Sequence, residues 1–304
     1  MNRRRLLLLG FGLMAALFPR CGREPPVQGP QVASAPAAPA VPNYRLAVHP
    51  LHNPAKLTEA YQPLIDHLNE RLQDTRLTLE ASRDYANFED KYRARRPEFL
   101  LPNPWQTLQA MKSGYRVIAM AGEPADFKGI FVVRKDSGLT RPEDLKGKAV
   151  SYPSPTALAA CIMPQYFLHR HGIDVMADLD NRYVGSQESA IMNAYLGLTA
   201  AGATWPPPWR AFVKAHPREA DELTVIWETE SLVNNSVMVR GDVPADVAER
   251  VAALLTGLEA TAEGRSILAG METARFLPAS DADYDVVSRY VERFEAEVRP
   301  VQPP

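Results

Sequence analysis

After residue 42 the chain alternates between short apolar runs and longer stretches with apolar positions at helical spacing. The short runs predict buried strands, and the longer stretches predict amphipathic helices with one stripe facing a core. Strands separated by helices are typical of βαβ units, whose parallel sheets are covered on both faces. The predicted strands lie at 44–48, 76–81, 98–101, 117–121, 130–134, 148–152 and 223–227, and the clearest helices lie at 54–72, 154–171, 244–257 and 261–268.

The strand, turn and helix at 145–174 carry candidate chemistry. Ser154 is a favoured N-cap residue, and Pro155 suits the first helical position, where no amide proton is needed. Gly172 marks the helix end. A helix N-terminus offers unpaired amides and the positive end of the dipole, so this turn is able to hold an anion. The pattern alone also fits an ordinary strand-to-helix connection without a ligand.

Further candidate contacts follow other predicted strands. Ligands of open α/β sheets bind beyond the carboxyl ends of the strands. His49 and His52 follow the first strand, Tyr85 opens the helix after the second, and Asn103 and Trp105 follow the third. A cap or a solvated loop accounts for the same residue types, so position alone leaves their roles open.

The same segment resembles the phosphate-, phosphite- and phosphonate-binding proteins of bacterial ABC importers. The shared residues are DLKGK at 144–148, Pro164, Leu168 and GID at 172–174. That family usually has Ser-Thr-Ser-Gly in the turn, where this chain has Ser-Pro-Thr-Ala at 154–157. The match therefore indicates the fold more strongly than the ligand.

The resemblance covers about residues 43–290. Asp84 and Tyr85 resemble a helix start whose tyrosine commonly contacts ligand, and Gln187 stands where the family often has a ligand-contacting histidine. An aspartate that the family often has near Trp205 is missing, and Trp205 is either a cleft wall or a packed helix entry. Further matching stretches are PLIDHL at 63–68, VVRKDSG at 132–138, GSQESA at 185–190, and AEGRSILAG to FLPASDADYD at 262–285.

The resemblance implies an α/β fold of the type 2 periplasmic-binding-protein class, with two crossing strands as a hinge. Lobe 1 is expected at 43–134 and 224–304, and lobe 2 at 135–223. Ligand oxygens are expected to meet the hydroxyls of Ser154 and Thr156 and the amides of Thr156 and Ala157. The expected ligand-binding residues are Tyr85, Asn103, Trp105, Ser154, Thr156, Ala157, Gln187, Trp205, His52 and Lys128.

Residues 1–20 have the form of an export signal. Three arginines at 3–5 precede an apolar run that is too short for a comfortable permanent membrane anchor. Cys21 and a Pro/Ala-rich tract follow, which resembles a bacterial lipoprotein with a lipidated cysteine and a disordered tether at 21–42. These features predict a periplasmic protein anchored to the membrane. Cleavage within the alanine-rich tract, after Ala37 or Ala40, is the alternative.

The charge balance argues against nucleic-acid binding. Without the four arginines of residues 1–20, the formal net charge falls from −2 to −6. Nucleic-acid binding needs a broad positive footprint, which such a chain lacks. If Cys21 carries lipid, Cys161 stands alone, so no disulfide framework is expected.

No sequence motif indicates a cofactor, a metal site or a catalytic centre. The spacing of His169 and His171 is that of an H-x-H pair, but on a helix such residues point to different sides. We find no nucleophile elbow, phosphate loop or zinc-protease motif. The chain is therefore predicted not to be an enzyme, and turnover of a phosphonate or phosphate ester would contradict that prediction.

The leading functional hypothesis is an exported, monomeric binding protein of an ABC importer. It captures phosphate, phosphite or a phosphonate between its lobes, and its closed form docks on a membrane permease. The alternative is a periplasmic sensor for another small solute that signals to a membrane kinase. Neighbouring genes for a permease and ATPase, or for a kinase, distinguish the two.

Overall fold

The computed structural model describes residues 41–302, which form one compact unit. The predictions for the signal at 1–20 and for Cys21 lie outside this range. Within it the strands are β1 (Asn43–Val48), β2 (Arg76–Glu80), β3 (Phe99–Leu101), β4 (Tyr115–Ala121), β5 (Ile130–Arg134), β6 (Ala149–Tyr152), β7 (Asp180–Tyr183), β8 (Ala201–Thr204), β9 (Leu223–Glu228), β10 (Asn235–Arg240) and β11 (Phe276–Leu277).

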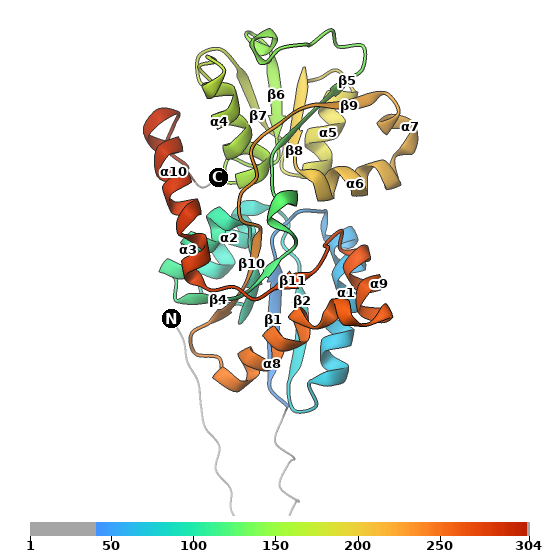
Figure 1. The fold of residues 1–304 in the computed structure, drawn as a ribbon, viewed down its shortest axis with the longest axis vertical. Helices are drawn as coiled ribbons and strands as arrows, with labels where there is room; N and C mark the ends of the chain where they lie inside the picture. The colour runs from blue at the N-terminus through green and yellow to red at the C-terminus, as the bar shows by residue number, and fades with distance from the viewer. Residues whose placement is uncertain (1–40, 303–304) are drawn as a thin grey trace, which may run out of the picture. The chain divides into compact units, whose positions relative to one another are not determined.

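The strands form two sheets (Figure 1). One has the order β11-β4-β10-β3-β1-β2 and the other β7-β6-β8-β5-β9. β1 pairs in parallel with β2 and β3, and β6 with β7 and β8, as crossover connections require. β10 runs antiparallel to β3 and β4, β11 runs antiparallel to β4, and β5 runs antiparallel to β8 and β9. The predicted α/β class is confirmed.

Helices connect the strands. The α-helices are α1 (Pro54–Arg71), α2 (Tyr85–Arg93), α3 (Pro104–Lys112), α4 (Met163–Arg170), α5 (Gln187–Tyr195), α6 (Pro206–Ala215), α7 (Pro217–Ala220), α8 (Ala245–Thr256), α9 (Ala262–Gly270) and α10 (Asp285–Glu297). Short 3-10 turns are η1 (Pro124–Asp126), η2 (Pro142–Leu145), η4 (Leu258–Ala260) and η5 (Asp281–Tyr284), and η3 (Leu158–Ile162) is a π-helical turn.

Side-chain caps determine where several helices begin. The side chains of Asn53, Asp84, Asn103, Ser186 and Thr261 each accept a hydrogen bond from an amide of the following first turn. Such a bond satisfies an amide that has no intrahelical acceptor and contributes about 1 kcal/mol. All of these positions except Thr261 follow a strand, so these caps also position residues at the strand ends.

The chain passes between the sheets twice. It leaves the first sheet after β4, returns after β9, and the two crossing segments at 122–129 and 229–234 lie side by side. The amide of Thr229 donates to the Gly129 carbonyl at 2.9 Å, and the amide of Leu232 donates to the Phe127 carbonyl at 2.9 Å. The two predicted crossings are present. They lie before β5 and after β9, because both strands pair within the second sheet and not at its boundary. The predicted lobe boundaries at 134 and 224 fall on these strands.

The helix predicted to begin at Ser154 begins later. Ser154 and Pro155 lie in a turn, and the chain enters the π-helical turn η3 at Leu158 before continuing into α4. Pro164 has no amide proton and cannot make the regular bond one turn back, which is consistent with the wider π-helical spacing just before it. The expectation that Ser154 caps this helix is therefore wrong.

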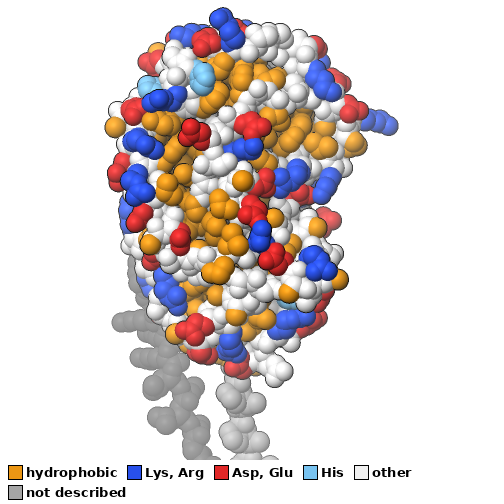
Figure 2. Space-filling view, viewed as in Figure 1, with side chains coloured by type: hydrophobic (Ala, Val, Ile, Leu, Met, Phe, Trp, Pro, Cys, Tyr) orange, Lys and Arg blue, Asp and Glu red, His pale blue; other side chains and the backbone are white. Residues whose placement is uncertain are grey.

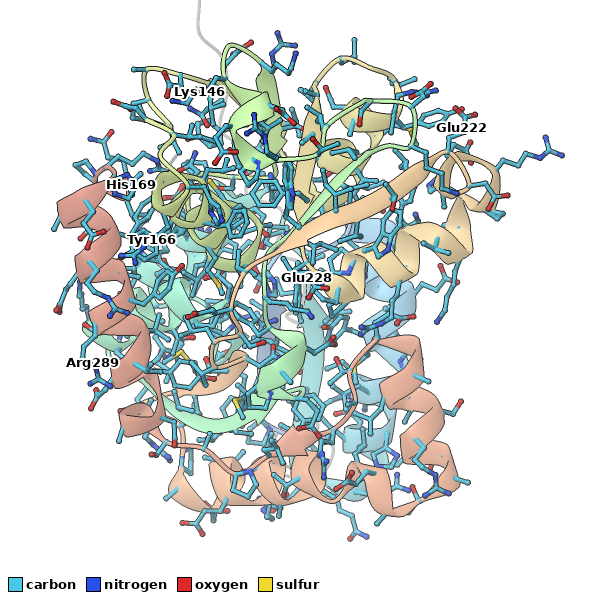
Figure 3. The ribbon with its side chains drawn as sticks, turned by 45° about the horizontal axis from the view of Figure 1, so that its top comes forward. Lys146, Tyr166, His169, Glu222, Glu228 and Arg289 are labelled. Atoms are coloured by element: carbon cyan, nitrogen blue, oxygen red, sulfur yellow. The ribbon has the colours of Figure 1, made fainter. Side chains whose placement is uncertain are left out.

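The C-terminal segment ties elements of both sheets together. α10 packs against α3 of the first sheet, and Tyr166 of α4 donates its hydroxyl to Glu297 at 3.0 Å. Figure 3 shows Tyr166 and His169 of α4 on the side facing α10, from which Arg289 projects. Arg299 follows α10 and donates to the side chain of Gln165 at 2.8 Å. One apolar cluster likewise contains residues of both sheets. The unit is therefore in a closed arrangement.

Among residues 41–302, no helix combines the length and the apolar character needed to cross a membrane. The face in Figure 2 mixes acidic and basic side chains over both sheets, without a large area of one sign.

A first prediction concerns Gly129 in the crossing segment. A Cβ atom there would lie 2.5 Å from the Ala159 carbonyl oxygen and 2.8 Å from Pro164. The substitution Gly129→Ala is expected to destabilise the fold by about 1–3 kcal/mol, because backbone must shift. Gly270→Ala is the control, since a Cβ there meets nothing within 4 Å. Thermal unfolding measures both, and equal melting temperatures for the two variants would contradict the prediction.

Candidate ligand-binding site

A small pocket lies where the two sheets face each other. Its free volume is about 10 Å³, room for about one water molecule. An oxyanion therefore enters only if the walls move apart, as hinge opening allows. The lining residues are His49, Tyr85, Asn103, Phe127, Ala157, Leu158, Ala159, Ala160, Gln187, Trp205 and Asn235.

The start of the η3–α4 helix supplies backbone donors to this pocket. Ile162 is the first residue whose amide has an acceptor in the turn, the Ala157 carbonyl at 3.1 Å. The amides of residues 158–161 therefore have no acceptor within the helix. Leu158, Ala159 and Ala160 all line the pocket. Their side chains carry no hydroxyl, so this helix start offers an anion its amides and dipole alone.

Two aromatic rings form an apolar wall. Phe127 comes from the crossing segment and Trp205 from the end of β8, and their ring centroids lie 5.5 Å apart. Both side chains are buried. A polar or charged ligand atom placed against this wall would lose hydrogen bonds to water without replacing them. The wall therefore suits a small apolar substituent.

A chain of hydrogen bonds crosses the cleft on another side. Gln187 donates to the Tyr85 hydroxyl at 3.1 Å and accepts from the Thr204 hydroxyl at 2.8 Å. Burial raises the pKa of Tyr85 above its ordinary value, so its hydroxyl stays protonated. The bond between Gln187 and Tyr85 joins the second sheet to the first. Gln187 keeps one N–H and one lone pair of its side-chain oxygen for further hydrogen bonds.

Histidine 49 is neutral and has a defined tautomer. Its Nδ1 lies 3.0 Å from the Leu101 carbonyl, which can only accept, so Nδ1 carries the proton. Burial lowers the pKa of His49 to about 4. The other ring nitrogen, Nε2, is then a bare acceptor. The pocket lining contains no lysine or arginine.

Ser154 and Thr156 do not offer their hydroxyls to this pocket. The Thr156 hydroxyl donates to Oε1 of Glu89 at 2.7 Å and lies 3.0 Å from the Ser154 hydroxyl. The Thr156 amide donates back to the Ser154 side chain at 3.3 Å, and the Ala157 amide to the Ser154 carbonyl at 3.2 Å. The groups expected to receive an anion are thus occupied within the chain, and the available amides lie further along, at residues 158–161.

Glu89 of α2 accepts the hydrogen bond from the Thr156 hydroxyl that was expected to go to a ligand anion. Its side chain is 0 % exposed and also accepts from Gln106 at 3.3 Å and from Arg93 at 2.7 Å. Burial raises the pKa of Glu89, although the hydrogen bonds from Thr156 and Gln106 oppose the shift. The Glu89 carboxyl group therefore joins the two sheets, together with the bond from the side-chain amide of Asn103 to the Thr156 carbonyl at 3.2 Å.

The family described as "ABC transporter, phosphonate, periplasmic substrate-binding protein" matches residues 46–284. The chain belongs to this family. Its members named below are binding components of transporters and not enzymes.

Individual relatives agree with the family. A probable ABC transporter phosphite binding protein, PhnD1 of Prochlorococcus marinus (strain MIT 9301), is 26% identical over 134 residues, which cover 41% of this chain and 45% of that relative. The matched segment therefore spans less than half of its length. The solved structure of PhnD1 from the same organism, in complex with methylphosphonate, has a TM-score of 0.76 at 19% identity, covering 83% of this chain and 98% of that one.

A second solved structure supports the fold. It is a binding protein component of an ABC phosphonate transporter from Pseudomonas aeruginosa, with a TM-score of 0.77 and 14% identity. The similarity covers 84% of this chain and 87% of that chain. At sequence identities this low, structural similarity is evidence for the fold alone. The similarity confirms the two-lobed architecture expected from the resemblance.

The expected ligand-binding residues divide into two groups by position. Tyr85, Asn103, Ala157, Gln187 and Trp205 come together around the pocket. The others lie elsewhere: Ser154 and Thr156 bond Glu89 as described, and Trp105, His52 and Lys128 do not line this pocket.

The three residues away from the pocket have other neighbours. Trp105 lies in a groove between α3 and α10, because helical spacing turns it away from the edge that Asn103 caps. His52 has a pKa lowered to about 4 by burial and lies in the field of Lys56, Glu188 and Glu272. Lys128 pairs with Glu228, which Figure 3 labels at the end of β9.

The sequence did not indicate Phe127, Asn235 or the amides beyond Ala157. The position of Asn235 in its strand could have indicated it. Asn235 begins β10, which runs antiparallel to β3 and β4. Its first residue therefore lies at the edge where its neighbours end. Recognising this required the strand order, which the sequence pattern does not contain.

Proposed function

We propose that this protein captures a small phosphorus oxyanion with a small apolar substituent, such as phosphite or methylphosphonate, and delivers it to an ABC permease. The observation that carries the proposal is the set of amides at residues 158–160 without an acceptor in the helix, in residues that line one pocket together with Phe127 and Trp205. The amides can donate hydrogen bonds to the oxygens of the ligand, and the two rings can pack against its apolar substituent.

The donors are numerous enough for useful affinity without a cationic side chain. A hydrogen bond to a charged group contributes about 1.5–3 kcal/mol. Three such bonds in a closed, water-poor cleft correspond to roughly micromolar dissociation after part of the gain is lost to ordering. The helix dipole adds to the same effect at residues 158–160.

The apolar wall formed by Phe127 and Trp205 is expected to give the candidate ligands different affinities. Phosphite carries a hydrogen and methylphosphonate a methyl group where phosphate carries a fourth oxygen. That oxygen would face Phe127 and Trp205 without a hydrogen-bond partner. The relative crystallised with methylphosphonate supports a ligand of this size and class.

Location and partners follow from the family. Periplasmic residence is its described location, and we propose in addition that Cys21 carries lipid and that the closed protein acts as a monomer on its permease. The basic, apolar and cysteine order of residues 1–21 supports lipidation. Mass spectrometry of the mature chain tests it, and an unmodified chain beginning near Ala38 or Val41 would reject it.

Calorimetric titration of the full chain tests the ligand. Phosphite or methylphosphonate is expected to bind with a Kd of about micromolar or tighter, and phosphate at least about tenfold more weakly. Sulfate serves as the comparison anion without phosphorus. Lack of binding by every phosphorus oxyanion would reject the proposal, and tighter binding of phosphate would reject the role of the apolar wall.

A further inference from the structure

Two hydrogen-bond acceptors in the pocket have no donor. The side-chain oxygen of Asn235 is buried, makes no hydrogen bond within residues 41–302, and belongs to a side chain that is 4 % exposed. Nε2 of His49 is the second, because its ring proton is on Nδ1 and goes to the Leu101 carbonyl. Both residues line the same pocket as the amides of residues 158–160.

A buried acceptor without a donor is costly, about 1–3 kcal/mol, so its presence needs an explanation. The oxygen and nitrogen of the Asn235 side-chain amide are assigned from hydrogen-bond partners, and the oxygen has none as placed. Its nitrogen has no partner among the described residues that would fix one orientation. His49 has no such freedom, since the Leu101 carbonyl can only accept.

The neighbours of His49 do not supply a donor for both acceptors. The rings of His49 and Tyr85 lie 6.3 Å apart between centroids at an interplanar angle of 66°, and the Tyr85 hydroxyl accepts from Gln187, so its own proton is left for one acceptor at most. His52 is the titratable group whose field acts on His49, and that field lowers the pKa of His49 further. A donor for the remaining acceptor therefore has to come with the ligand.

A fully deprotonated oxyanion has no proton to offer. The lone pairs of its oxygens would face the lone pairs of His49 Nε2 and of the Asn235 oxygen. These lone pairs repel each other. An oxyanion that keeps one hydroxyl donates that proton to an acceptor, while its bare oxygens accept from the amides. The same pocket then satisfies both kinds of group.

We propose that the pocket selects oxyanions that keep a proton on one oxygen, with that hydroxyl donating to His49 Nε2 or to the side-chain oxygen of Asn235. This inference rests on the proposed function and narrows its ligand class. It favours the monoanions of phosphite and phosphonates and disfavours sulfonates and sulfate, which carry no proton at neutral pH.

Methylphosphonate and methanesulfonate form a matched pair of probes. They share shape, size and the methyl group, and at about pH 5.5 both are mainly monoanions, since the second ionisation of such phosphorus acids lies higher. His49 remains neutral there, with its pKa near 4. The two ligands then differ in the single hydroxyl that the inference concerns.

Calorimetry of the full wild-type chain at about pH 5.5 is the first measurement. We expect methylphosphonate to bind at least about 100-fold more tightly than methanesulfonate, since one donor is lost and one acceptor is left facing an anion. Affinities within threefold of each other would overturn the inference and leave the proposed function standing. Binding by neither ligand would overturn both, and tighter binding of methanesulfonate would overturn the inference.

The variants Asn235→Leu and His49→Phe each remove an acceptor with little change in volume. Each is expected to weaken methylphosphonate binding about tenfold and to leave methanesulfonate binding unchanged or stronger, so the ratio of the two affinities falls. A purely structural role would lower both affinities by the same factor, and an unchanged ratio in both variants would overturn the assignment. The wild-type comparison decides the selectivity itself even if a variant does not fold.

Discussion

Replacing Glu89 with alanine is expected to lower the free energy of unfolding by about 3 kcal/mol at pH 5. The change leaves the hydroxyl of Thr156 and the amide of Gln106 without their buried acceptor, and each such loss costs about 1–3 kcal/mol. The melting temperature should fall by roughly 2–4 °C per kcal/mol. Glu59→Ala is the control, because Glu59 is exposed.

The size of this effect should depend on pH. Burial holds the pKa of Glu89 above its ordinary value, so the folded chain keeps the proton longer than the unfolded chain. The contribution of Glu89 to stability is then fully present below the unfolded pKa of about 4.5 and decreases as pH rises through the folded pKa. The stability gap between wild type and Glu89→Ala should narrow between pH 5 and pH 8, and a widening gap would contradict the raised pKa.

A double-mutant cycle with Thr156→Val separates two roles of the threonine. Its hydroxyl bonds Glu89 across the sheets, so the two substitutions are expected to couple by about 1–2 kcal/mol in stability. A hydroxyl that instead served a ligand oxygen would show no coupling in the ligand-free protein and a loss of affinity. Small-angle scattering should also show that Thr156→Val opens more readily than wild type, because one bond between the lobes is gone.

Replacing Trp205 with alanine should have the largest effect on ligand choice. The ring packs on Phe127 at 5.5 Å and is buried, so its removal opens space in the pocket. Loss of a buried tryptophan costs about 3–5 kcal/mol of stability. Methylphosphonate should bind at least tenfold more weakly, while a phosphonate with a phenyl or butyl group should gain affinity relative to it. Calorimetric titration of both ligands measures the change in preference.

Trp209→Ala is the matched control for that experiment. Trp209 lies on α6, stacks on Phe212 with ring centroids 5.9 Å apart, and does not line the pocket. It should lower stability without changing the preference between the two phosphonates. Equal shifts in preference for both tryptophan variants would show that the pocket wall is not specific to Trp205.

Much of the local structure is readable from the chain. Asn53, Asp84 and Asn103 each stand before a helix and each accepts an amide bond in its first turn, so cap chemistry alone located these helices. The alternation of strands and helices predicted parallel pairing, which β1 and β6 confirm. The family resemblance rested on segments spread along the chain. It could therefore identify the architecture of the chain as a whole.

The binding site depended more on the tertiary structure. The sequence singled out Tyr85 because it follows a predicted strand and matches a family helix start, and the family resemblance drew attention to Gln187 and to the region of Trp205. Asn235 was missed because its place at that edge depends on β10 running against its neighbours. Phe127 was missed because it lies in a crossing segment that has no periodic pattern.

The sequence by itself determined many of the elements, several of their caps and the family, since these depend on residues close together in the chain. Only the tertiary structure decided which backbone amides are left free at the pocket. Thr156 is 67 positions from Glu89, and no local pattern shows that its hydroxyl meets that carboxylate. Once it does, the hydroxyls at 154 and 156 are satisfied within the chain. The unpaired amides of residues 158–160, which line the pocket, are then left as its candidate donors.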